Sequence, residues 1–179
     1  MGESNARLAA VGISGSPGAT SKSRLLVQYA LDRLAAQGAS TELVDLATLP
    51  ADALLGRGTA PPVAAALERT TRARVVVAGT PVYRATYSGL LKVFFDLLPQ
   101  DGLVGKIAIP IVTGHDRGHS LALDHGVRPL FASLGATVVA NGVYGTSAQF
   151  TDGQAAPELL AAVDRAVCEA LALGGVALT

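Results

Sequence analysis

Apolar residues fall along this chain in two alternating patterns. Short, nearly uncharged apolar runs end at Gly, Pro or polar residues, which is typical of buried strands. Between them lie longer segments whose apolar positions recur with the spacing of a helix. Strands are expected at 7–14, 41–46, 74–80, 105–114 and 137–145. Helices are expected at 23–38, 62–73, 88–99, 119–135 and 156–173.

The regular alternation of strand and helix predicts the fold. Strands that each lead into a helix form a parallel sheet with helices on both faces, a three-layer α/β sandwich. Right-handed crossovers leave few topologies, and the doubly wound order 2-1-3-4-5 of a five-stranded sheet is the leading one. We therefore expect a single α/β domain over residues 1–179, with flexible ends at 1–6 and 175–179.

Prolines and a glycine interrupt two of these elements. Pro110 lies inside the expected strand 105–114, and because proline has no N–H to donate, it suggests a bulge or an edge position. In the helix 119–135, Gly126 disfavours helix and Pro129 cannot donate to the carbonyl of His125. We expect a bulged or widened turn there.

Composition narrows the class of protein. Half of the residues are hydrophobic, 16% are charged and the formal net charge is zero, so nothing electrostatic favours nucleic acid or an anionic membrane as a partner. The single cysteine, Cys168, lies in an apolar helical pattern and is expected to be a buried core thiol. Since no charged segment followed by an apolar stretch opens the chain, we expect a cytoplasmic protein.

The loop after the first strand has the composition of a phosphate site. In a doubly wound sheet, ligands bind beyond the carboxyl ends of the strands, near the first and third strands. The segment "SGSPGATSKSR" (14–24) leads into a helix N-terminus, whose free N–H groups suit a phosphate. Its spacing fits neither a Walker A loop nor a dinucleotide fingerprint, so it indicates a single phosphate. A helix cap with surplus serines is the alternative, and slightly favoured for this segment alone. The candidate hydroxyl donors are Ser16, Thr20, Ser21 and Ser23.

The loop after the third strand, "GTPVYRATYSG" (79–89), suits a flat ring. Gly79 and Pro81 take the chain sharply off the strand with its backbone exposed. Tyr83 and Tyr87 then pack against a ring or substrate, or alternatively fill a subunit contact; this segment alone does not decide between them.

The loop after the fourth strand, "TGHDRGH" (113–119), offers backbone groups to a ligand at Thr113 and Gly114. Its two histidines and its aspartate do not predict a metal site, because His125 lies too far along the helix and no second carboxylate joins them. No Ser-His-Asp or Cys-His set lies at the strand ends, so hydrolase chemistry is not supported.

Three segments together carry a family resemblance. "ISGSP", "TPVYRATYSGLLKVFFDLLP" and "GKIAIPIVTGHDRGHSLALDHGVRPLFASLGA" resemble the NAD(P)H-dependent FMN reductases of flavodoxin-like fold. The similarity spans roughly residues 9–150 and is closest to the reductases of bacterial sulfonate-utilisation two-component monooxygenase systems. The resemblance implies FMN and NADPH (or NADH) as cofactors, and reduced FMN passed to a separate flavin-dependent monooxygenase. It implies that FMN contacts Ser14, Ser16, Thr20, Ser21, Ser23, Pro81, Val82, Tyr83, Tyr87, Thr113, Gly114 and His115.

The chain departs from the family pattern at two positions, and a third varies within the family. Members often carry Arg directly after Ser-Pro, where this chain has Gly18, so charge for the phosphate must come from Lys22, Arg24 or the helix terminus. His115 stands where the family commonly has Gly, and the position of His125 is Tyr or His in relatives. The helix that carries His125 lies near subunit contacts in the family, so His125 either tunes assembly or flavin access, or is a polar interface residue without a chemical role.

The resemblance implies hydride transfer from nicotinamide C4 to flavin N5, which needs no catalytic acid, base or nucleophile from the protein. Two alternatives remain: a reductase that retains its FMN and reduces quinones, azo dyes or metals, and a flavodoxin-type electron carrier. The carrier is the weakest of the three, because carriers tend to be acidic and this chain is neutral.

The helix 88–99 is apolar nearly all round, with only Lys92 and Asp96 as a polar stripe. Because the sheet covers only one side of such a helix, we expect a second subunit to cover the other, giving a homodimer or homotetramer.

Overall fold

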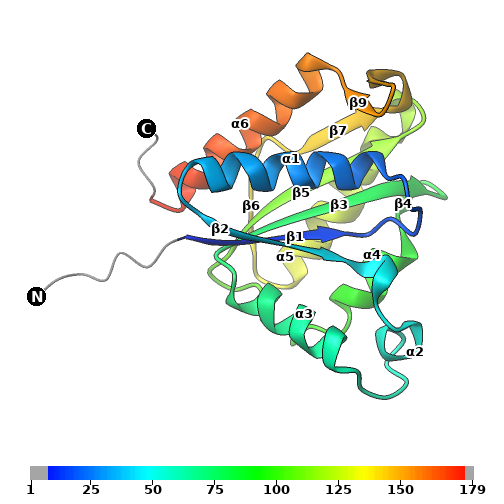
Figure 1. The fold of residues 1–179 in the computed structure, drawn as a ribbon, viewed down its shortest axis with the longest axis vertical. Helices are drawn as coiled ribbons and strands as arrows, with labels where there is room; N and C mark the ends of the chain where they lie inside the picture. The colour runs from blue at the N-terminus through cyan, green and yellow to red at the C-terminus, as the bar shows by residue number, and fades with distance from the viewer. Residues whose placement is uncertain (1–7, 176–179) are drawn as a thin grey trace, which may run out of the picture.

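A single twisted sheet runs through the centre of the molecule, with helices on both faces (Figure 1). The computed structural model describes residues 8–175, so the chain ends expected to be flexible lie outside the described residues apart from Gly175. The central strands are parallel and lie in the order β2 (Ser40–Asp45), β1 (Ala9–Ser14), β3 (Val75–Tyr83) and β5 (Ile107–Gly114). The predicted doubly wound order is confirmed.

The fifth position of the sheet is shared by two short strands, and this splits the single strand predicted at 137–145. β6 (Thr137–Val138) pairs with the start of β5, and β7 (Val143–Thr146) pairs with its end. Pro110 lies between these two ladders, buried and in register with β3. It is therefore in an interior strand, at the point where the neighbouring strand is interrupted and its missing N–H leaves no ladder bond unmade.

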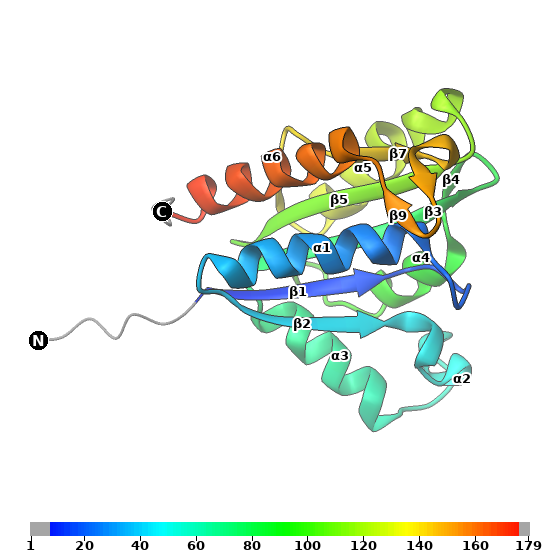
Figure 2. The ribbon, with the colours of Figure 1, turned by 45° about the horizontal axis from the view of Figure 1, so that its top comes forward.

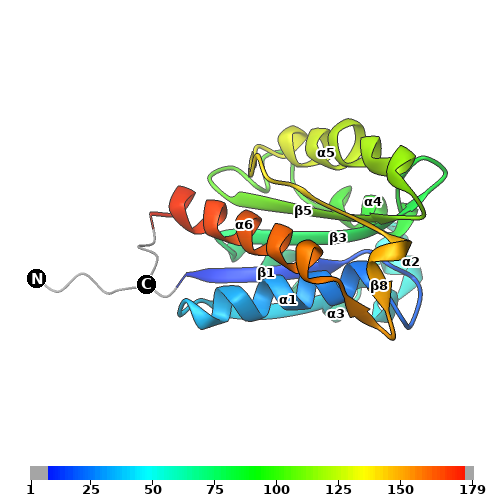
Figure 3. The ribbon, with the colours of Figure 1, turned by 90° about the horizontal axis from the view of Figure 1, so that it is seen from above.

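The helices form two layers. α1 (Lys22–Ala36) and α6 (Pro157–Leu173) lie side by side on one face, as Figure 3 shows from above. α3 (Pro61–Arg72), α4 (Gly89–Phe95) and α5 (Arg128–Ser133) pack on the other face. α4 ends four residues earlier than expected, because Leu97 and Leu98 continue in tight turns that bond to Phe94 and Phe95.

The predicted helix 119–135 is irregular. It begins as a 3₁₀ turn, Arg117–Ser120, continues as a π-helix, Leu123–Val127, and only then becomes α5. The widened turn expected around His125 is confirmed, and it follows from Gly126 and Pro129, which weaken the regular helix ladder.

The structure also contains short elements that the sequence pattern did not predict. β4 (Thr86–Tyr87) folds back on β3 through a turn at Arg84 and Ala85, both with positive φ. After β2 come a 3₁₀ turn, Leu46–Thr48, and α2 (Ala51–Leu54). After β7 come another 3₁₀ turn, Ser147–Gln149, and a hairpin of β8 (Phe150–Thr151) and β9 (Gln154–Ala155). Elements of two to four residues are too short to show a period.

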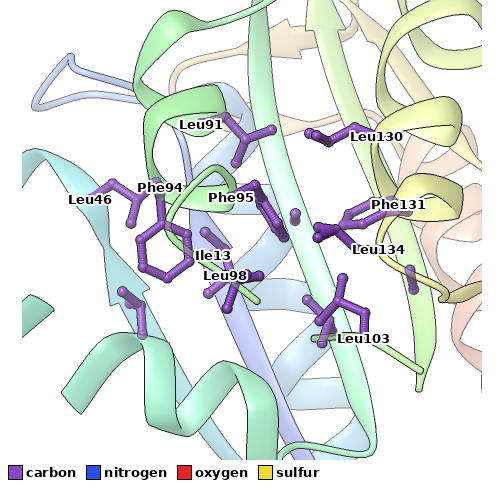
Figure 4. Packing of buried hydrophobic residues seen from close by; sticks show 14 of the residues in the cluster. Ile13, Leu46, Leu91, Phe94, Phe95, Leu98, Leu103, Leu130, Phe131 and Leu134 are labelled. Carbon is purple, nitrogen blue, oxygen red and sulfur yellow. The ribbon is translucent and has the colours of Figure 1, made fainter. Parts of the chain in front are cut away.

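Buried side chains form one cluster on each side of the sheet. In the cluster under α4 and α5, Phe95 packs edge-on against Phe94 and Phe131, with ring centroids 5.7 and 5.5 Å apart (Figure 4). Cys168 was predicted to be buried, and this was wrong, because α6 turns it to solvent and buries Val163, Ala166 and Val167 instead. Within residues 8–175, no helix is long and apolar enough to cross a membrane.

Candidate functional site

A cavity of about 290 Å³ opens at the carboxyl ends of the central strands. The loop after β1 and the start of α1 form one wall, the last residues of β3 and β5 with His115 form another, and Ser147 after β7 completes it. Its lining residues are Ser16, Gly18, Thr20, Ser21, Lys22, Pro81, Val82, Tyr83, Thr113, Gly114, His115 and Ser147.

The loop after β1 presents hydroxyl groups and the N-terminus of α1 to this cavity. Ser21 is the N-cap of α1, since its Oγ accepts a hydrogen bond from the Arg24 N–H at 3.1 Å, and it also lies 3.1 Å from the Oγ of Ser23. The Oγ of Ser16 accepts from the Gly18 N–H at 3.3 Å. Hydroxyls, free N–H groups and a positive helix end are the donor set that a phosphate requires.

Ser88 joins the loop after β1 to the carboxyl end of β3. Its buried Oγ donates to the carbonyl of Gly15 at 2.5 Å and accepts from the Leu91 N–H at 3.1 Å, which caps α4. Its backbone N–H donates to the Thr80 Oγ1 at 2.9 Å, and the Gly15 N–H donates to the carbonyl of Gly79 at 2.8 Å. The loop after β1 and the end of β3 are therefore held in a fixed relation without using the residues that face the cavity.

The carboxyl end of β3, which extends three residues beyond the predicted strand, places an aromatic surface on the cavity. Pro81 and Val82 are half-buried, and Tyr83 is 49% exposed. Tyr87 is turned away, because its ring lies over Gly126 of the π-helix and packs against the core cluster under α4 and α5. The structure thus separates the two tyrosines, with Tyr83 at the cavity and Tyr87 behind it.

The loop after β5 is fixed from the side of β7. The Tyr144 hydroxyl donates to the carbonyl of Asp116, and a Cβ on Gly114 would overlap that hydroxyl. Burial, and then the charge of Asp116, raises the pKa of Tyr144, which keeps it a hydrogen-bond donor. Ser147 completes this wall, since its Oγ donates to the carbonyl of Gly114 at 3.3 Å.

Most of the residues predicted to contact a cofactor line this cavity, but three do not. Ser14 and Ser23 are fully buried beneath the first loop, and Tyr87 lies outside the lining. Gly18 and Ser147 line it without having been named as contacts, and Lys22, which we named as a possible source of charge for the phosphate, lines it too. Ser147 had a sequence signal, because "GTSAQ" (145–149), at the end of β7, has the small polar residues of the other carboxyl-end segments.

A larger hollow of about 480 Å³ lies elsewhere, between α3 and the beginnings of β1 and β2. Arg69 pairs there with Glu42 at 2.9 Å, and Arg72 pairs with Glu68 at 3.1 Å. It lies at the amino end of the strands, away from the edge where doubly wound sheets bind ligands, so the smaller cavity is the candidate site.

The strand order, and a cavity placed between the loops of the first and third strands, define a protein of the flavodoxin-like class. Solved structures agree. The apo form of the NADH:FMN oxidoreductase EMOB has a TM-score of 0.85 and 32% identity, covering 96% of this chain and 91% of that one. A flavodoxin from Streptococcus pneumoniae, with a TM-score of 0.61 and 18% identity over 92% of this chain and 98% of its own, shares the fold alone.

The sequence profile of the NADPH-dependent FMN reductases matches residues 8–151, and this chain belongs to that family. It is 33% identical to an FMN reductase (NADPH) of Escherichia coli strain K12, over 82% of this chain and 77% of the relative. It is 35% identical to the NADH-dependent FMN reductase SfnF of Pseudomonas fluorescens, over 90% of this chain and 89% of the relative. The predicted class of NAD(P)H:FMN oxidoreductase, with FMN and NADPH or NADH as cofactors, is confirmed.

Proposed function

We propose that this protein binds FMN in the cavity between the loops after β1, β3 and β5, reduces it with NAD(P)H and releases reduced FMN to a separate flavin-dependent monooxygenase. The observation that carries the proposal is the lining itself. It joins a phosphate-type donor set at the start of α1 to an exposed aromatic surface at Tyr83. The resemblance to sulfonate-system reductases supports release to a partner enzyme.

The residues of the cavity fit the two ends of FMN. Ser16, Thr20 and Ser21, with the first N–H groups of α1, would hold the phosphate. Pro81, Val82 and Tyr83 would hold the isoalloxazine ring, and Thr113, Gly114 and His115 would bind along its edge. Ser14, Ser23 and Tyr87, which we also expected to contact FMN, would support these loops from behind.

Bound FMN would supply the redox chemistry, accepting hydride from nicotinamide C4 at its N5. The chain's contribution is to orient the two partners. Ser88 and Thr80 fix the loop that carries the ring surface, and Tyr144 and Ser147 fix the opposite loop. Holding two reactants at contact distance contributes much of the rate of such a transfer.

The test uses the purified protein. We expect oxidation of NADPH or NADH that requires added FMN, and a protein that is colourless or only weakly yellow as isolated. No oxidation with either nucleotide, with or without FMN, would contradict an enzymatic function. Retained yellow flavin with turnover only when a quinone is added would favour the flavin-retaining reductase instead.

We also propose a homodimer or homotetramer that works in the cytoplasm. An apolar hollow between α2 and α4 is lined by Ala51, Leu54, Leu55, Gly89, Leu90 and Val93. Leu55 is 54% exposed there, and Leu90 and Val93 are only half-buried. A second copy of the chain would cover this surface, as the apolar pattern of the helix led us to expect.

A further inference from the structure

Lys22 is the one Lys or Arg among the residues that line the cavity. It is the first residue of α1, directly after the N-cap Ser21, and its Nζ lies 5.5 Å from the centroid of the Phe150 ring. Within residues 8–175, no carboxylate forms an ion pair with it. Its charge is therefore held by an aromatic face and left available to an anion.

The position of Lys22 in the helix is unfavourable without such an anion. The first turn of a helix carries a partial positive charge, and lysine there adds charge of the same sign. The first turn of α1 contains no acidic residue that would offset it. A phosphate bound at the free N–H groups of this turn would turn the repulsion into attraction.

Phe150 is placed by its own hairpin. It begins β8, and Figure 2 shows the β8–β9 hairpin beside the amino end of α1, although more than a hundred residues separate the two in sequence. The capping box of Thr146 and Gln149 and the bond from the Ala156 N–H to the Gln149 carbonyl, at 2.8 Å, close the base of this hairpin. The Phe150 ring packs against the core cluster under α1 and α6, so its position is fixed.

The other cations do not meet these conditions. Arg24 pairs with Asp45 at 3.1 Å and is not part of the cavity lining. Arg84 and Arg117 belong to the loops after β3 and β5 and are also outside the lining. Gly18, which lines the cavity on the same loop, has no side chain and brings no charge to it.

We propose that Phe150 is a positioning residue that holds the Lys22 ammonium over the first turn of α1, where Lys22 binds the phosphate of FMN. The ammonium has three donors, so it can bond to phosphate oxygens while one side stays on the ring. This inference rests on the proposed function, since it assigns the charge partner of the ligand in that same site.

The experiment compares FMN with riboflavin, which has the same ring system but no phosphate, by quenching of flavin fluorescence on the purified full chain. We expect Lys22→Met to weaken FMN binding about tenfold and riboflavin binding less than about twofold, because only FMN loses a charge-assisted bond. We expect Phe150→Leu to weaken FMN binding about threefold, with riboflavin unchanged. Adding Phe150→Leu to Lys22→Met should have no further effect, because the ring acts only through the lysine.

Two variants serve as controls. Phe150→Tyr keeps the aromatic ring and should keep the wild-type preference for FMN over riboflavin. It shows whether the effect of Phe150→Leu comes from loss of the ring or from misfolding of the variant. Arg24→Met should change FMN binding less than about twofold, since Arg24 is already paired with Asp45.

An unchanged ratio of FMN to riboflavin affinity in Lys22→Met would overturn the assignment of Lys22. A loss of FMN affinity in Arg24→Met as large as that in Lys22→Met would also overturn it. Equal weakening of both flavins by Phe150→Leu, or full additivity of the two substitutions, would overturn the role of Phe150. A wild-type protein that binds neither flavin would instead overturn the proposed function.

Discussion

At the scale of single residues, the site depends on where side chains are missing as much as on where they are present. Gly79 lies in the buried part of β3, and a Cβ there would overlap Val27 and lie 2.9 Å from the carbonyl oxygen of Ser23. The absent side chain lets α1 pack closely enough for its N-terminus to reach the cavity. Gly18 differs, because a Cβ there would meet nothing closer than 3.6 Å.

We therefore expect Gly79→Ala to lower the free energy of unfolding by about 1–3 kcal/mol, the cost of overpacking a rigid contact. Gly18→Ala is the matched control and should leave stability nearly unchanged. Urea denaturation measures both. Equal stability of the two variants would mean that α1 can shift to accommodate the methyl group.

Tyr83 and Tyr87 give a second prediction at this scale. Tyr83→Ala should weaken the binding of FMN and of riboflavin equally, by about tenfold, because the lost ring stacks on the flavin and does not contact the phosphate. Tyr87→Ala should leave flavin affinity nearly unchanged, since its ring faces the π-helix, and should alter assembly, because the family resemblance implies that this helix lies near subunit contacts. Flavin fluorescence titration measures the first effect and sedimentation the second. The reverse outcome would mean that the roles are exchanged.

At the scale of elements, side chains on two helices hold the loop 139–142, which joins β6 to β7. Glu169 on α6 accepts hydrogen bonds from the Ala140 N–H at 2.5 Å, the Asn141 N–H at 2.9 Å and the Asn141 side chain at 2.7 Å. Arg128 on α5 donates to the carbonyls of Val139 and Ala140 at 2.5 and 2.6 Å. Burial acts to raise the pKa of Glu169. The hydrogen bonds that it accepts from Ala140 and Asn141, together with the positive charge of Arg128, outweigh this, so the net shift of the pKa is downward.

This downward shift fixes the pH dependence of the loop's stability. The carboxylate stabilises the fold fully above the pKa that it has in the unfolded chain, about 4.3, and this contribution is lost as the pH falls through the lower folded value. Glu169→Gln should be less stable than the wild type by about 1 kcal/mol at neutral pH, with the difference shrinking in acid. Thermal unfolding across pH measures this.

Glu68→Gln is the control for that series, because the Glu68 carboxylate pairs with Arg72 at an exposed position and no other ion pair of it is found within residues 8–175. It should change stability little at any pH. A Glu169→Gln difference that persists unchanged into strong acid would contradict the role assigned to the ionised carboxylate.

At the scale of the whole molecule, the apolar surface of α2 and α4 concerns assembly. Leu55→Glu places a charge within this surface, on a side chain that is already 54% exposed, so it should leave the subunit folded. We expect the oligomer to dissociate or to weaken at least tenfold in affinity, roughly 1.4 kcal/mol, because burying an unpaired charge is costly. Sedimentation equilibrium measures the mass.

Val104→Glu is the matched control for Leu55→Glu, since Val104 is 59% exposed but lies outside the hollow between α2 and α4. It should keep the wild-type mass. A wild-type protein that is monomeric at micromolar concentration would contradict the homo-oligomer, and equal effects of the two substitutions would show that this surface is not the interface.

The sequence by itself determined the order of the main elements, the sheet topology, the widened turn near His125 and the three loops that form the cavity. Each depends on local physics, such as the period of apolar residues, the missing N–H of proline and the small polar residues at strand ends. These properties are present in the chain whatever it packs against.

Only the tertiary structure decided which residues of those loops face the cavity. Ser14 and Ser16 are two residues apart, yet Ser14 lies fully buried under the loop and Ser16 faces the cavity. Cys168 lies in an apolar helical pattern, but the packing of α6 turned it outward. Phe150 reaches Lys22 only because the β8–β9 hairpin crosses to the start of α1. Contacts between residues distant in the chain have no local pattern, because they depend on how whole elements pack.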